Sequence, residues 1–481
     1  MKRFEDLLTQ SKFLKKKYQY DGVEWCVRNE LAVDPIHNVR GGIIADEMGL
    51  GKTIMMIGTM YANLCKRTLI VVPPILIEQW AKEIYRTSGH RALVYYGSAK
   101  KSMTLEQILL APIVLTSYHA VAIRKNNPEM GLLHKIMWNR VIFDEAHHLR
   151  NKQTSLFWGC KNIRAPCKWF VTGTPIQNKK TDFYSLCNAL GLPVDFYTDS
   201  VNKKLIREKF ILYRTKEMVD IQLPPVHVET CVVLWKNNDE KKLAEEIHST
   251  LNISGVSYEK GGSFSNQLLQ NRIIVAFLRA KQSCIMTSLM KNNIDELIQE
   301  ERIEGNYQQS IVSTSKLDAV VEKIVSRKGE GKGKIVFCQF LQEMDYLLER
   351  LTECGLVVMR YRGDKKIGGI NDKKIGGIND KKMGMNDVLI LQIQTGCEGL
   401  NLQENFNEVY FVSPHWNPAI EDQAIGRCHR IGQQHDVHVF KFVMEDFDRD
   451  NDLSQAITLE TYIQNVQDYK RLISHSLLVE E

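Results

Sequence analysis

Short apolar runs alternate with amphipathic stretches along most of this chain, and this alternation constrains the fold more than any other feature. In the first half, the runs with the length and composition of buried strands are GGIIAD, TLIVVPP, PIVLTSY, RVIFDEA and WFVTGTP. In the second half, the pattern returns in GKIVFCQF, DVLILQI, EVYFVSP and VHVFKFV. Strands that alternate with helices are typical of parallel sheets covered by helices. The sequence therefore predicts an α/β protein with two parallel-sheet units.

The stretch from about residue 200 to residue 315 has a different pattern. It loses the strand rhythm and reads as mainly helical in NDEKKLAEEIHSTL, NRIIVAFLRAKQSCIMTSLMKN and NIDELIQEERIEG. A Gly/Ser break at EKGGSFSNQ interrupts it. A length of 481 residues allows roughly three compact parts. We therefore expect a first lobe over 1–200, a helical insertion and inter-lobe linker over 201–315, and a second lobe over 316–481.

Composition excludes several classes of protein. The N-terminal stretch MKRFEDLLTQSKFLKKKYQYDG has no apolar core, and no window reaches the roughly 18 apolar residues of a membrane span, so neither secretion nor a membrane is indicated. The 11 cysteines form no C-x-x-C pair, which indicates neither a zinc ribbon nor a disulfide framework and favours a reducing compartment. The net charge of +6 favours an anionic partner only mildly.

An eight-residue repeat interrupts the second half. DKKIGGIN at 364–371 recurs at 372–379 and decays to DKKMGMN at 380–386. Gly-Gly and Lys-Lys pairs cannot bury a face, so we expect a solvated surface loop, with a loop that touches DNA as the alternative.

The stretch GGIIADEMGLGKTIMMIGTM at 41–60 is similar to a phosphate-binding loop, although Asp46 stands where the pattern G-x-x-x-x-G-K-[ST] has its first glycine. A buried strand, a glycine turn and a helix that begins at Lys52 provide the required geometry. Lys52 would supply a positive charge to the β- and γ-phosphates, and the Thr53 hydroxyl would ligate magnesium. A chance GKT at a helix start is the alternative. The residues expected to bind the nucleotide here are Asp46, Glu47, Met48, Gly49, Leu50, Gly51, Lys52 and Thr53.

An acidic pair follows another apolar strand in RVIFDEAHHLRN. Carboxylates at the carboxyl end of a parallel strand are typical of metal and water sites. We expect Asp144 to hold magnesium through water, and Glu145 to orient and deprotonate the water that attacks the γ-phosphorus.

With these motifs identified, the chain resembles the Swi/Snf-type ATPases, which have the superfamily two helicase fold. The motifs that carry the resemblance are DEMGLGKT, DEAH, TGTPIQN at 172–178 and QAIGRCHRIGQ at 423–433. Further similar stretches are KYQYDGVEW, LIVVPPILIEQW, VLTSYHAV, YRTKEMVDIQLPPV, STSKLD, KIVFCQF and VSPHWNP. The resemblance covers nearly the whole chain. It implies two RecA-like lobes and a functional loop in which Asp46 is a family trait.

The same resemblance implies ligands and partners. ATP and Mg²⁺ would bind in the cleft, and double-stranded DNA would bind across both lobes through its phosphates. The output would be translocation on the duplex without full strand separation, which remodels nucleosomes or other DNA-bound complexes. The nucleus is the expected location, or a cytoplasmic site of DNA replication if the source is viral; neither zinc nor a membrane is expected. The alternatives are a strand-separating DNA or RNA helicase of the same superfamily, and a DNA-binding scaffold with an inert ATP site.

Roles for further residues also follow from the resemblance. Gln19 would read the adenine edge. The arginines of the pattern Q-x-x-G-R-x-x-R would reach the γ-phosphate as fingers, whereas without the family they would be read as a solvated helix face. The residues of that pattern are Gln423, Gly426, Arg427 and Arg430. The residues expected to couple nucleotide state to lobe closure are His147, Thr172, Gly173, Thr174 and Gly399.

The chain departs from the family at LQIQTGCEGLNL, where Glu398 precedes the glycine and puts affinity for the DNA backbone in doubt. Two other features have plainer interpretations. His429, His435 and His438 lack a fourth ligand and are not expected to bind metal. Trp416 in PHWNP is expected to pack rather than contact DNA.

Overall fold

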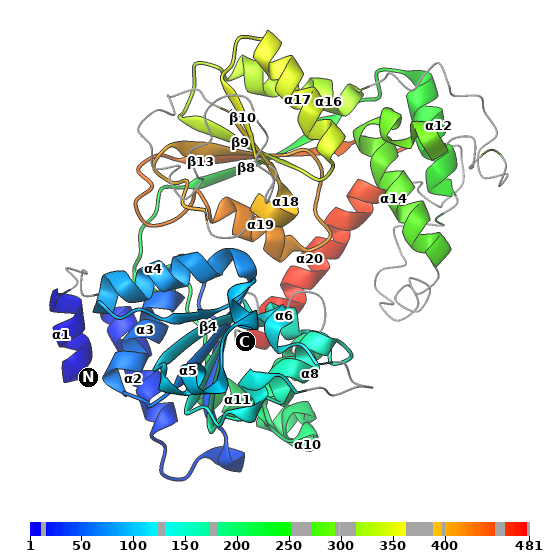
Figure 1. The fold of residues 1–481 in the computed structure, drawn as a ribbon. Helices are drawn as coiled ribbons and strands as arrows, with labels where there is room; N and C mark the ends of the chain where they lie inside the picture. The colour runs from blue at the N-terminus through cyan, green and yellow to red at the C-terminus, as the bar shows by residue number, and fades with distance from the viewer. Residues whose placement is uncertain are drawn as a thin grey trace. The chain divides into compact units, whose positions relative to one another are not determined.

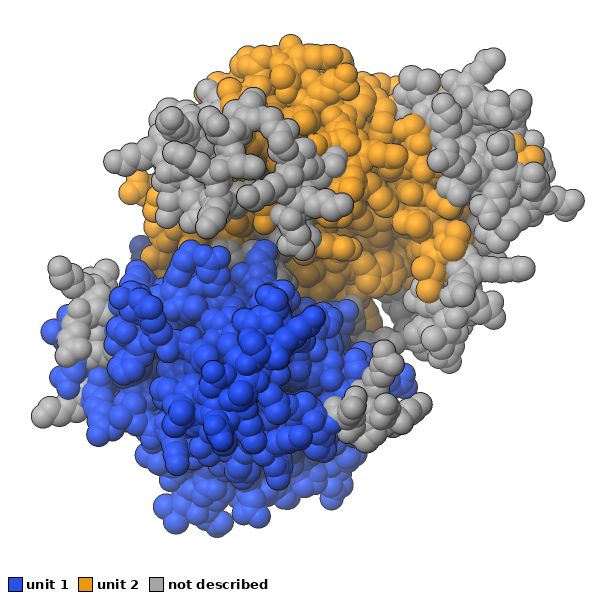
Figure 2. All heavy atoms as spheres, viewed as in Figure 1, with its two compact units in different colours: residues 1–222, 472–481 blue, residues 223–471 orange. Residues whose placement is uncertain are grey.

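The computed structural model describes residues 1–10, 16–123, 130–173, 180–249, 251, 271–293, 298, 314–361, 388–396, 400–447 and 457–478. The chain forms two compact units (Figure 2). Unit 1 comprises residues 1–222 with 472–481, and unit 2 comprises residues 223–471.

Unit 1 is built on a seven-stranded parallel sheet in the order β3-β4-β2-β5-β6-β1-β7. Its strands are β1 Arg40–Ile44, β2 Thr68–Val72, β3 Leu93–Tyr95, β4 Ile113–Ser117, β5 Arg140–Asp144, β6 Cys167–Val171 and β7 Ile211–Leu212. Successive strand residues point to opposite faces, so each inner strand contributes to two cores. Ile142 belongs to one core and Phe143 to the other. This is why the central strands read as continuous apolar runs.

Helices cover both faces of this sheet (Figure 1). One core includes side chains of α2, α3 and α4, and the other includes side chains of α8, α9 and α11. The α-helices of this unit are α1 Lys2–Gln10, α2 Lys17–Glu30, α3 Lys52–Ala62, α4 Ile77–Ser88, α5 Leu105–Leu110, α6 Tyr118–Val121, α7 Leu132–Lys135, α8 Ser155–Lys161, α9 Lys180–Leu190, α10 Val194–Thr198 and α11 Lys203–Phe210. The short 3-10 helix η4 Ala146–Leu149 follows β5.

Unit 2 is built on a six-stranded parallel sheet in the order β10-β11-β9-β12-β13-β8. Its strands are β8 Val226–Val233, β9 Gly333–Cys338, β10 Val358–Tyr361, β11 Val388–Gln392, β12 Phe406–Phe411 and β13 Val437–Met444. Within the described residues that follow residue 223, the α-helices are α12 Asn238–Ser249, α14 Asn271–Ile285, α16 Ser315–Ser326, α17 Leu341–Glu353, α18 Ile393–Gly396, α19 Pro418–Ile425 and α20 Leu459–Leu478. Helices α16 and α17 pack on one face, and α19 packs on the other (Figure 1).

The predicted α/β class with two parallel sheets is confirmed. The segment 201–315 contains α12 and α14, as its helical pattern indicates, but it also contributes one strand to each sheet. β7 pairs with β1 and β8 pairs with β13. Both are edge strands, and β7 has only two residues, so neither leaves a buried apolar run in the sequence. The limits of the functional domains stay a prediction.

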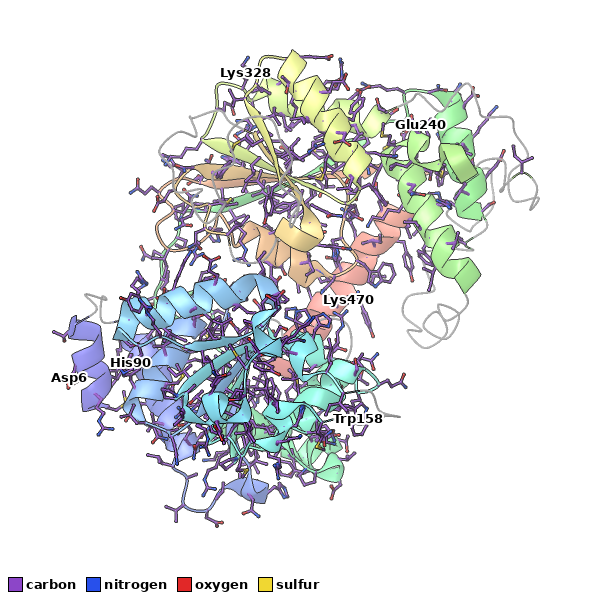
Figure 3. All side chains as sticks on the ribbon, in the orientation of Figure 1. Asp6, His90, Trp158, Glu240, Lys328 and Lys470 are labelled. Atoms are coloured by element: carbon purple, nitrogen blue, oxygen red, sulfur yellow. The ribbon has the colours of Figure 1, made fainter. Side chains whose placement is uncertain are left out.

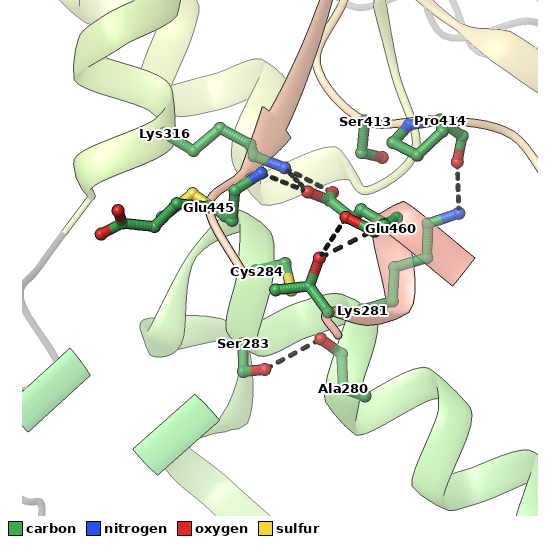
Figure 4. A network of polar contacts seen from close by, with 12 residues as sticks. Ala280, Lys281, Ser283, Cys284, Lys316, Ser413, Pro414, Glu445 and Glu460 are labelled. Atoms are coloured by element: carbon green, nitrogen blue, oxygen red, sulfur yellow. Dashed lines mark hydrogen bonds and ion pairs between the residues drawn. The ribbon is translucent and has the colours of Figure 1, made fainter. Parts of the chain in front are cut away.

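A buried ion pair ties the helices of unit 2 together (Figure 4). Lys316 on α16 and Glu460 on α20 are both fully buried and paired, and the Met444 N–H donates to Glu460 Oε2 at 2.9 Å. Breaking such a pair by removing one partner costs about 3–5 kcal/mol, because the other charge stays buried. The lysine of the STSKLD stretch is thus part of the internal framework of this unit.

Trp416 packs, as expected. Its ring lies 6.0 Å from that of Phe277 and 6.1 Å from that of Tyr462, measured between centroids. Lys470, labelled in Figure 3, lies 4.9 Å from the Trp416 ring centroid and donates to the Trp416 carbonyl at 2.8 Å. The repeat at 364–386 lies outside the described residues. Among the helices within the described ranges, none combines the length and apolar character that crossing a bilayer requires.

Candidate active site

The phosphate loop connects β1 to α3. Gly49 and Gly51 have φ angles of +92° and +79°, in the left-handed region that a residue without a Cβ adopts most readily. A Cβ on Gly51 would also collide with the Gln19 side-chain amide, which donates to the Leu50 carbonyl at 3.2 Å. The Gln19 side chain therefore contacts the backbone of the loop. A contact between Gln19 and adenine stays a prediction.

Lys52 interacts electrostatically with the acidic residues of both predicted motifs, the phosphate loop and the acidic pair. Its Nζ donates to the carbonyl oxygens of Asp46 at 2.8 Å and of Glu47 at 3.3 Å. Burial lowers the pKa of the ammonium, and the negative charges of Glu145, Asp46 and Asp144 offset part of this effect. Carboxylates from two separate strand ends thus act on one ammonium group.

The end of β6 approaches the same ammonium group. A Cβ on Gly173 would lie 2.9 Å from Met48 Cγ and 3.4 Å from Lys52 Nζ, so a side chain there would press on the loop. The buried residue Thr172 donates its N–H to the Ile44 carbonyl at 2.9 Å. The predicted coupling residues Thr172 and Gly173 therefore contact the phosphate loop region, while Thr174 lies outside the described residues.

Asp46 has an internal partner that accounts for its place in the loop. Its carboxylate is fully buried and accepts from Arg214 Nε at 3.1 Å and from Arg214 Nη2 at 2.5 Å. Glu47 accepts from the Lys216 backbone N–H at 2.8 Å, and its other oxygen lies 2.8 Å from Lys216 Nζ. No role for Arg214 or Lys216 was predicted. The available signal was Asp46 itself, since a carboxylate in a buried loop requires a cationic or hydrogen-bonding partner.

Asp144 ends β5 at the same level of the sheet as the end of β1. Both Asp144 and Ile44 are in register with Val171 of β6, which lies between the two strands. The Asp144 carboxylate accepts from the Trp80 indole N–H at 2.7 Å on one oxygen and from the Glu145 N–H at 3.0 Å on the other. Burial and the charge of Glu145 raise the pKa of Asp144 to about 6.

Glu145 has an unusual backbone conformation for a residue with a side chain. Its φ of 51° and ψ of 48° place it in the left-handed region, which costs on the order of 1–3 kcal/mol and is concentrated at functional sites. Its Oε2 lies 3.2 Å from Nδ1 of His147, whose ring stacks on that of His148 at 4.7 Å. The sharp turn after β5 thus directs Glu145 and the predicted coupling residue His147 toward each other.

Substitution of Trp80 tests its hydrogen bond to Asp144. Trp80→Phe removes the indole N–H, and because that donor lowers the pKa of Asp144, the pKa should rise further above about 6. A hydrogen bond to a charged group is worth about 1.5–3 kcal/mol, so the acid limb of the pH profile of ATP turnover should move up by about one to two pH units. The measurement is kcat/KM against pH at saturating magnesium.

Tyr118→Phe is the matched control for this substitution. The Tyr118 hydroxyl donates at 2.7 Å to the backbone carbonyl of Asp144, not to its carboxylate. For Tyr118→Phe, the acid limb of the kcat/KM profile should therefore lie at the same pH as in the unmodified chain. If Trp80→Phe lowers only the melting temperature and leaves the acid limb unmoved, Trp80 acts by packing alone.

The oxygen donors of this site fit a magnesium ion. Magnesium prefers hard oxygen ligands and retains several waters, so one or two protein oxygens suffice. Each Asp144 oxygen accepts a single hydrogen bond from the described residues, which leaves lone pairs for such waters. Thr53 is the second residue of α3, at the end of the phosphate loop.

In unit 2, the predicted catalytic residues lie on α19 and the turn after it. Gln423 and Arg427 are buried, so they do not form a solvated helix face. The Leu402 N–H donates to the Arg427 carbonyl at 3.1 Å, and Arg430 Nη1 donates to the Asn401 side-chain oxygen. Asn401 belongs to the run 399–402 that the resemblance associates with lobe coupling, and it is not among the predicted site residues. Gly399 lies outside the described residues, two residues before it.

Gln423 has a feature typical of a residue that binds a ligand. Its Nε2 is buried, and within the described part of the chain it contacts no hydrogen-bond acceptor. Burial and the neighbouring charge of Arg427 lower the pKa of Arg430. In unit 2, Arg427 and Arg430 thus follow closely on a buried amide nitrogen for which the described residues offer no hydrogen-bond acceptor.

Comparison with known proteins gives consistent matches to both units. A model of the SNF2-related domain matches residues 18–199, and a model of the helicase conserved C-terminal domain matches residues 315–432. Chromodomain-helicase-DNA-binding protein 9 of Homo sapiens is 29% identical over 467 residues, which cover 89% of this chain and 15% of that protein. ATP-dependent DNA helicase DDM1 of Arabidopsis thaliana is 26% identical over 492 residues, which cover 93% of this chain and 60% of that protein.

Among solved structures, the Sulfolobus solfataricus SWI2/SNF2 ATPase core in complex with dsDNA is 21% identical, with a TM-score of 0.39, and covers 96% of this chain and 93% of that chain. The chain spans less than two thirds of the length of the curated relatives named above. The two matched domain models together span more than half of the chain and follow each other in the order of the two units. The chain therefore belongs to the Swi/Snf-type family of superfamily two helicase-like ATPases.

Proposed function

We propose that this chain hydrolyses ATP in a reaction stimulated by double-stranded DNA, and that it uses the reaction to move along the duplex and remodel protein–DNA complexes. The observation that best supports the proposal is the convergence of Lys52, Gly173 and the Asp144–Glu145 pair at the carboxyl ends of β1, β5 and β6. A lysine between backbone carbonyls and carboxylates, beside a glycine turn, suits a triphosphate with its metal ion.

In unit 1, each residue has a chemical role in this proposal. Lys52, placed beside the Asp46 and Glu47 carbonyls, donates to the β- and γ-phosphate oxygens, and Thr53 and Asp144 would hold magnesium. Magnesium, when bound, neutralises charge that develops on the phosphate oxygens. Glu145 orients the attacking water and accepts its proton. Asp46 and Glu47 act on the nucleotide indirectly, through the carbonyls that contact Lys52, because their carboxylates are held by Arg214 and Lys216.

In unit 2, Arg427 and Arg430 are the proposed arginine fingers, and Gln423 is the proposed polar partner of the nucleotide or its water. The hydrogen bond from Arg430 to the Asn401 side chain supports this role, because a guanidinium group that is already ordered loses less entropy when it binds phosphate. Closure of the two lobes around ATP would bring these groups to the γ-phosphate. Thr172, Gly173, Thr174, His147 and Gly399 are the proposed coupling residues.

The proposed partners are double-stranded DNA and complexes assembled on it, such as nucleosomes, with the nucleus as the proposed location. The names of the relatives support a DNA partner, since they are a DNA helicase and a helicase that binds DNA. Phosphate contacts would dominate such binding, which would therefore depend on salt and hardly on base sequence.

The choice of nucleic acid separates the proposed function from its alternatives. We expect duplex DNA to stimulate ATP turnover more strongly than single-stranded DNA or RNA of equal length. DNA binding should weaken with a log–log salt slope of about −0.9 per phosphate neutralised. Stronger stimulation by single strands or RNA would favour a strand-separating helicase. DNA binding with no ATP turnover would favour the inert scaffold.

A further inference from the structure

The phosphate loop lies against a second chain segment, residues 211–216, that no motif of the nucleotide site includes. β7 is in register with the end of β1, with Ile211 opposite Ile43 and Leu212 opposite Ile44. The ladder continues beyond both strands, because Ala45 N–H donates to the Leu212 carbonyl at 2.8 Å and Glu47 N–H donates to the Arg214 carbonyl at 2.9 Å. The first part of the loop is thus an extension of the sheet.

Side chains reinforce this ladder at two successive loop residues. Arg214 forms a bidentate ion pair with the fully buried Asp46 carboxylate, and this geometry fixes both the position and the orientation of the carboxylate. Lys216 pairs with Glu47, but this carboxylate is 39% exposed. Since exposed ion pairs contribute little, Arg214 should account for most of the effect.

Arg214 also contacts the two helices that border the loop. Its Nη1 donates to the Tyr18 carbonyl on α2, and its Nη2 lies 3.1 Å from Met55 Sδ on α3. α2 provides space for it at Gly22, where a Cβ would lie 2.8 Å from Arg214 Nη2. One guanidinium group therefore joins the loop to both helices.

These contacts affect the position of Lys52. Arg214 and Lys216 fix the carboxylates of Asp46 and Glu47, and the backbone carbonyls of the same two residues contact the lysine. Lys52 Nζ donates to the Asp46 and Glu47 carbonyls. We propose that Arg214, assisted by Lys216, is a positioning residue of the nucleotide site: it fixes Asp46 and Glu47 so that Lys52 is presented to the triphosphate. The inference rests on the proposed ATP function.

A double-mutant cycle on ATP affinity tests this inference. Arg214→Met should weaken equilibrium ATP binding about tenfold in the otherwise unchanged chain. If Arg214 acts through Lys52, the same substitution in a Lys52→Ala background should weaken binding less than about twofold, because the group it positions is absent. Lys216→Met should weaken binding less than about threefold.

Two further variants separate positioning from folding. Arg214→Met leaves a buried carboxylate unpaired, which destabilises a protein strongly. Asp46→Asn combined with Arg214→Met removes both charges, and it should restore the melting temperature without restoring ATP affinity. Arg214→Lys keeps the charge but loses the bidentate geometry, so its ATP affinity should lie between that of Arg214→Met and that of the unmodified chain. Arg86→Met, which removes a guanidinium from a side chain 63% exposed, is the matched control and should bind ATP normally.

The possible outcomes distinguish this inference from the proposed function. Equal losses from Arg214→Met with and without Lys52 would overturn the positioning role, and so would full affinity in the charge-free double variant. Absence of ATP binding in the unmodified chain, or normal ATP binding in Lys52→Ala, would instead remove the proposed function on which the inference rests.

Discussion

Lys52→Ala and Glu145→Gln are each expected to abolish ATP turnover, for different reasons. The first removes the ammonium group that lies between the Asp46 and Glu47 carbonyls, so ATP binding should weaken as well. The second removes the proton acceptor but leaves the loop intact, so ATP should stay bound without being hydrolysed. Loss of a general base alone lowers rates by about 10²–10⁴-fold. Steady-state turnover and equilibrium nucleotide binding, measured together, distinguish the two effects.

Matched controls for this pair lie on α4 of the same unit. Lys82 and Glu78 form an exposed ion pair at 2.8 Å, with side chains 64% and 79% exposed. Lys82→Ala and Glu78→Gln repeat the same chemical changes away from the site and should leave turnover unchanged. Near-normal turnover in Lys52→Ala and Glu145→Gln would show that these two residues do not form the site of ATP hydrolysis.

Arg430→Ala is expected to show the second large effect. ATP affinity should change little, because unit 1 supplies the phosphate loop. Turnover should fall by about a thousandfold or more, the effect attributed to arginine fingers. If DNA acts by favouring the closed arrangement of the lobes, it should no longer stimulate this variant, since closure then brings no guanidinium group to the γ-phosphate. The measurement is ATP turnover with and without duplex DNA.

Arg350→Ala is the control for Arg430→Ala, because it removes a guanidinium group from α17 that is 47% exposed. It should leave both ATP turnover and its stimulation by DNA unchanged. An Arg430→Ala variant that duplex DNA still stimulates strongly would show that Arg430 is no finger. The catalytic role of unit 2 would then depend on Arg427 alone.

Much of the fold and of the candidate site could be predicted because it is encoded in contiguous residues. A buried strand, a glycine turn and a helix follow one another within residues 41–60, and the acidic pair directly follows the apolar run of β5. In a parallel sheet, the carboxyl ends of neighbouring strands meet at one edge. That rule places Asp144 and Lys52 at the same edge of the sheet, and the strand order then separates β1 from β5 by β6 alone.

Local periodicity and turn chemistry are therefore enough to predict the two sheets, the phosphate loop and the acidic pair. The partners that hold these groups come from distant parts of the folded chain: Arg214 lies 168 residues from Asp46, and Trp80 lies 64 residues from Asp144. The tertiary structure also decided the strand order, in which the short strand β7 is an edge strand next to β1. Periodicity shows which face of an element is buried, whereas an ion pair or hydrogen bond between distant residues depends on how the elements pack.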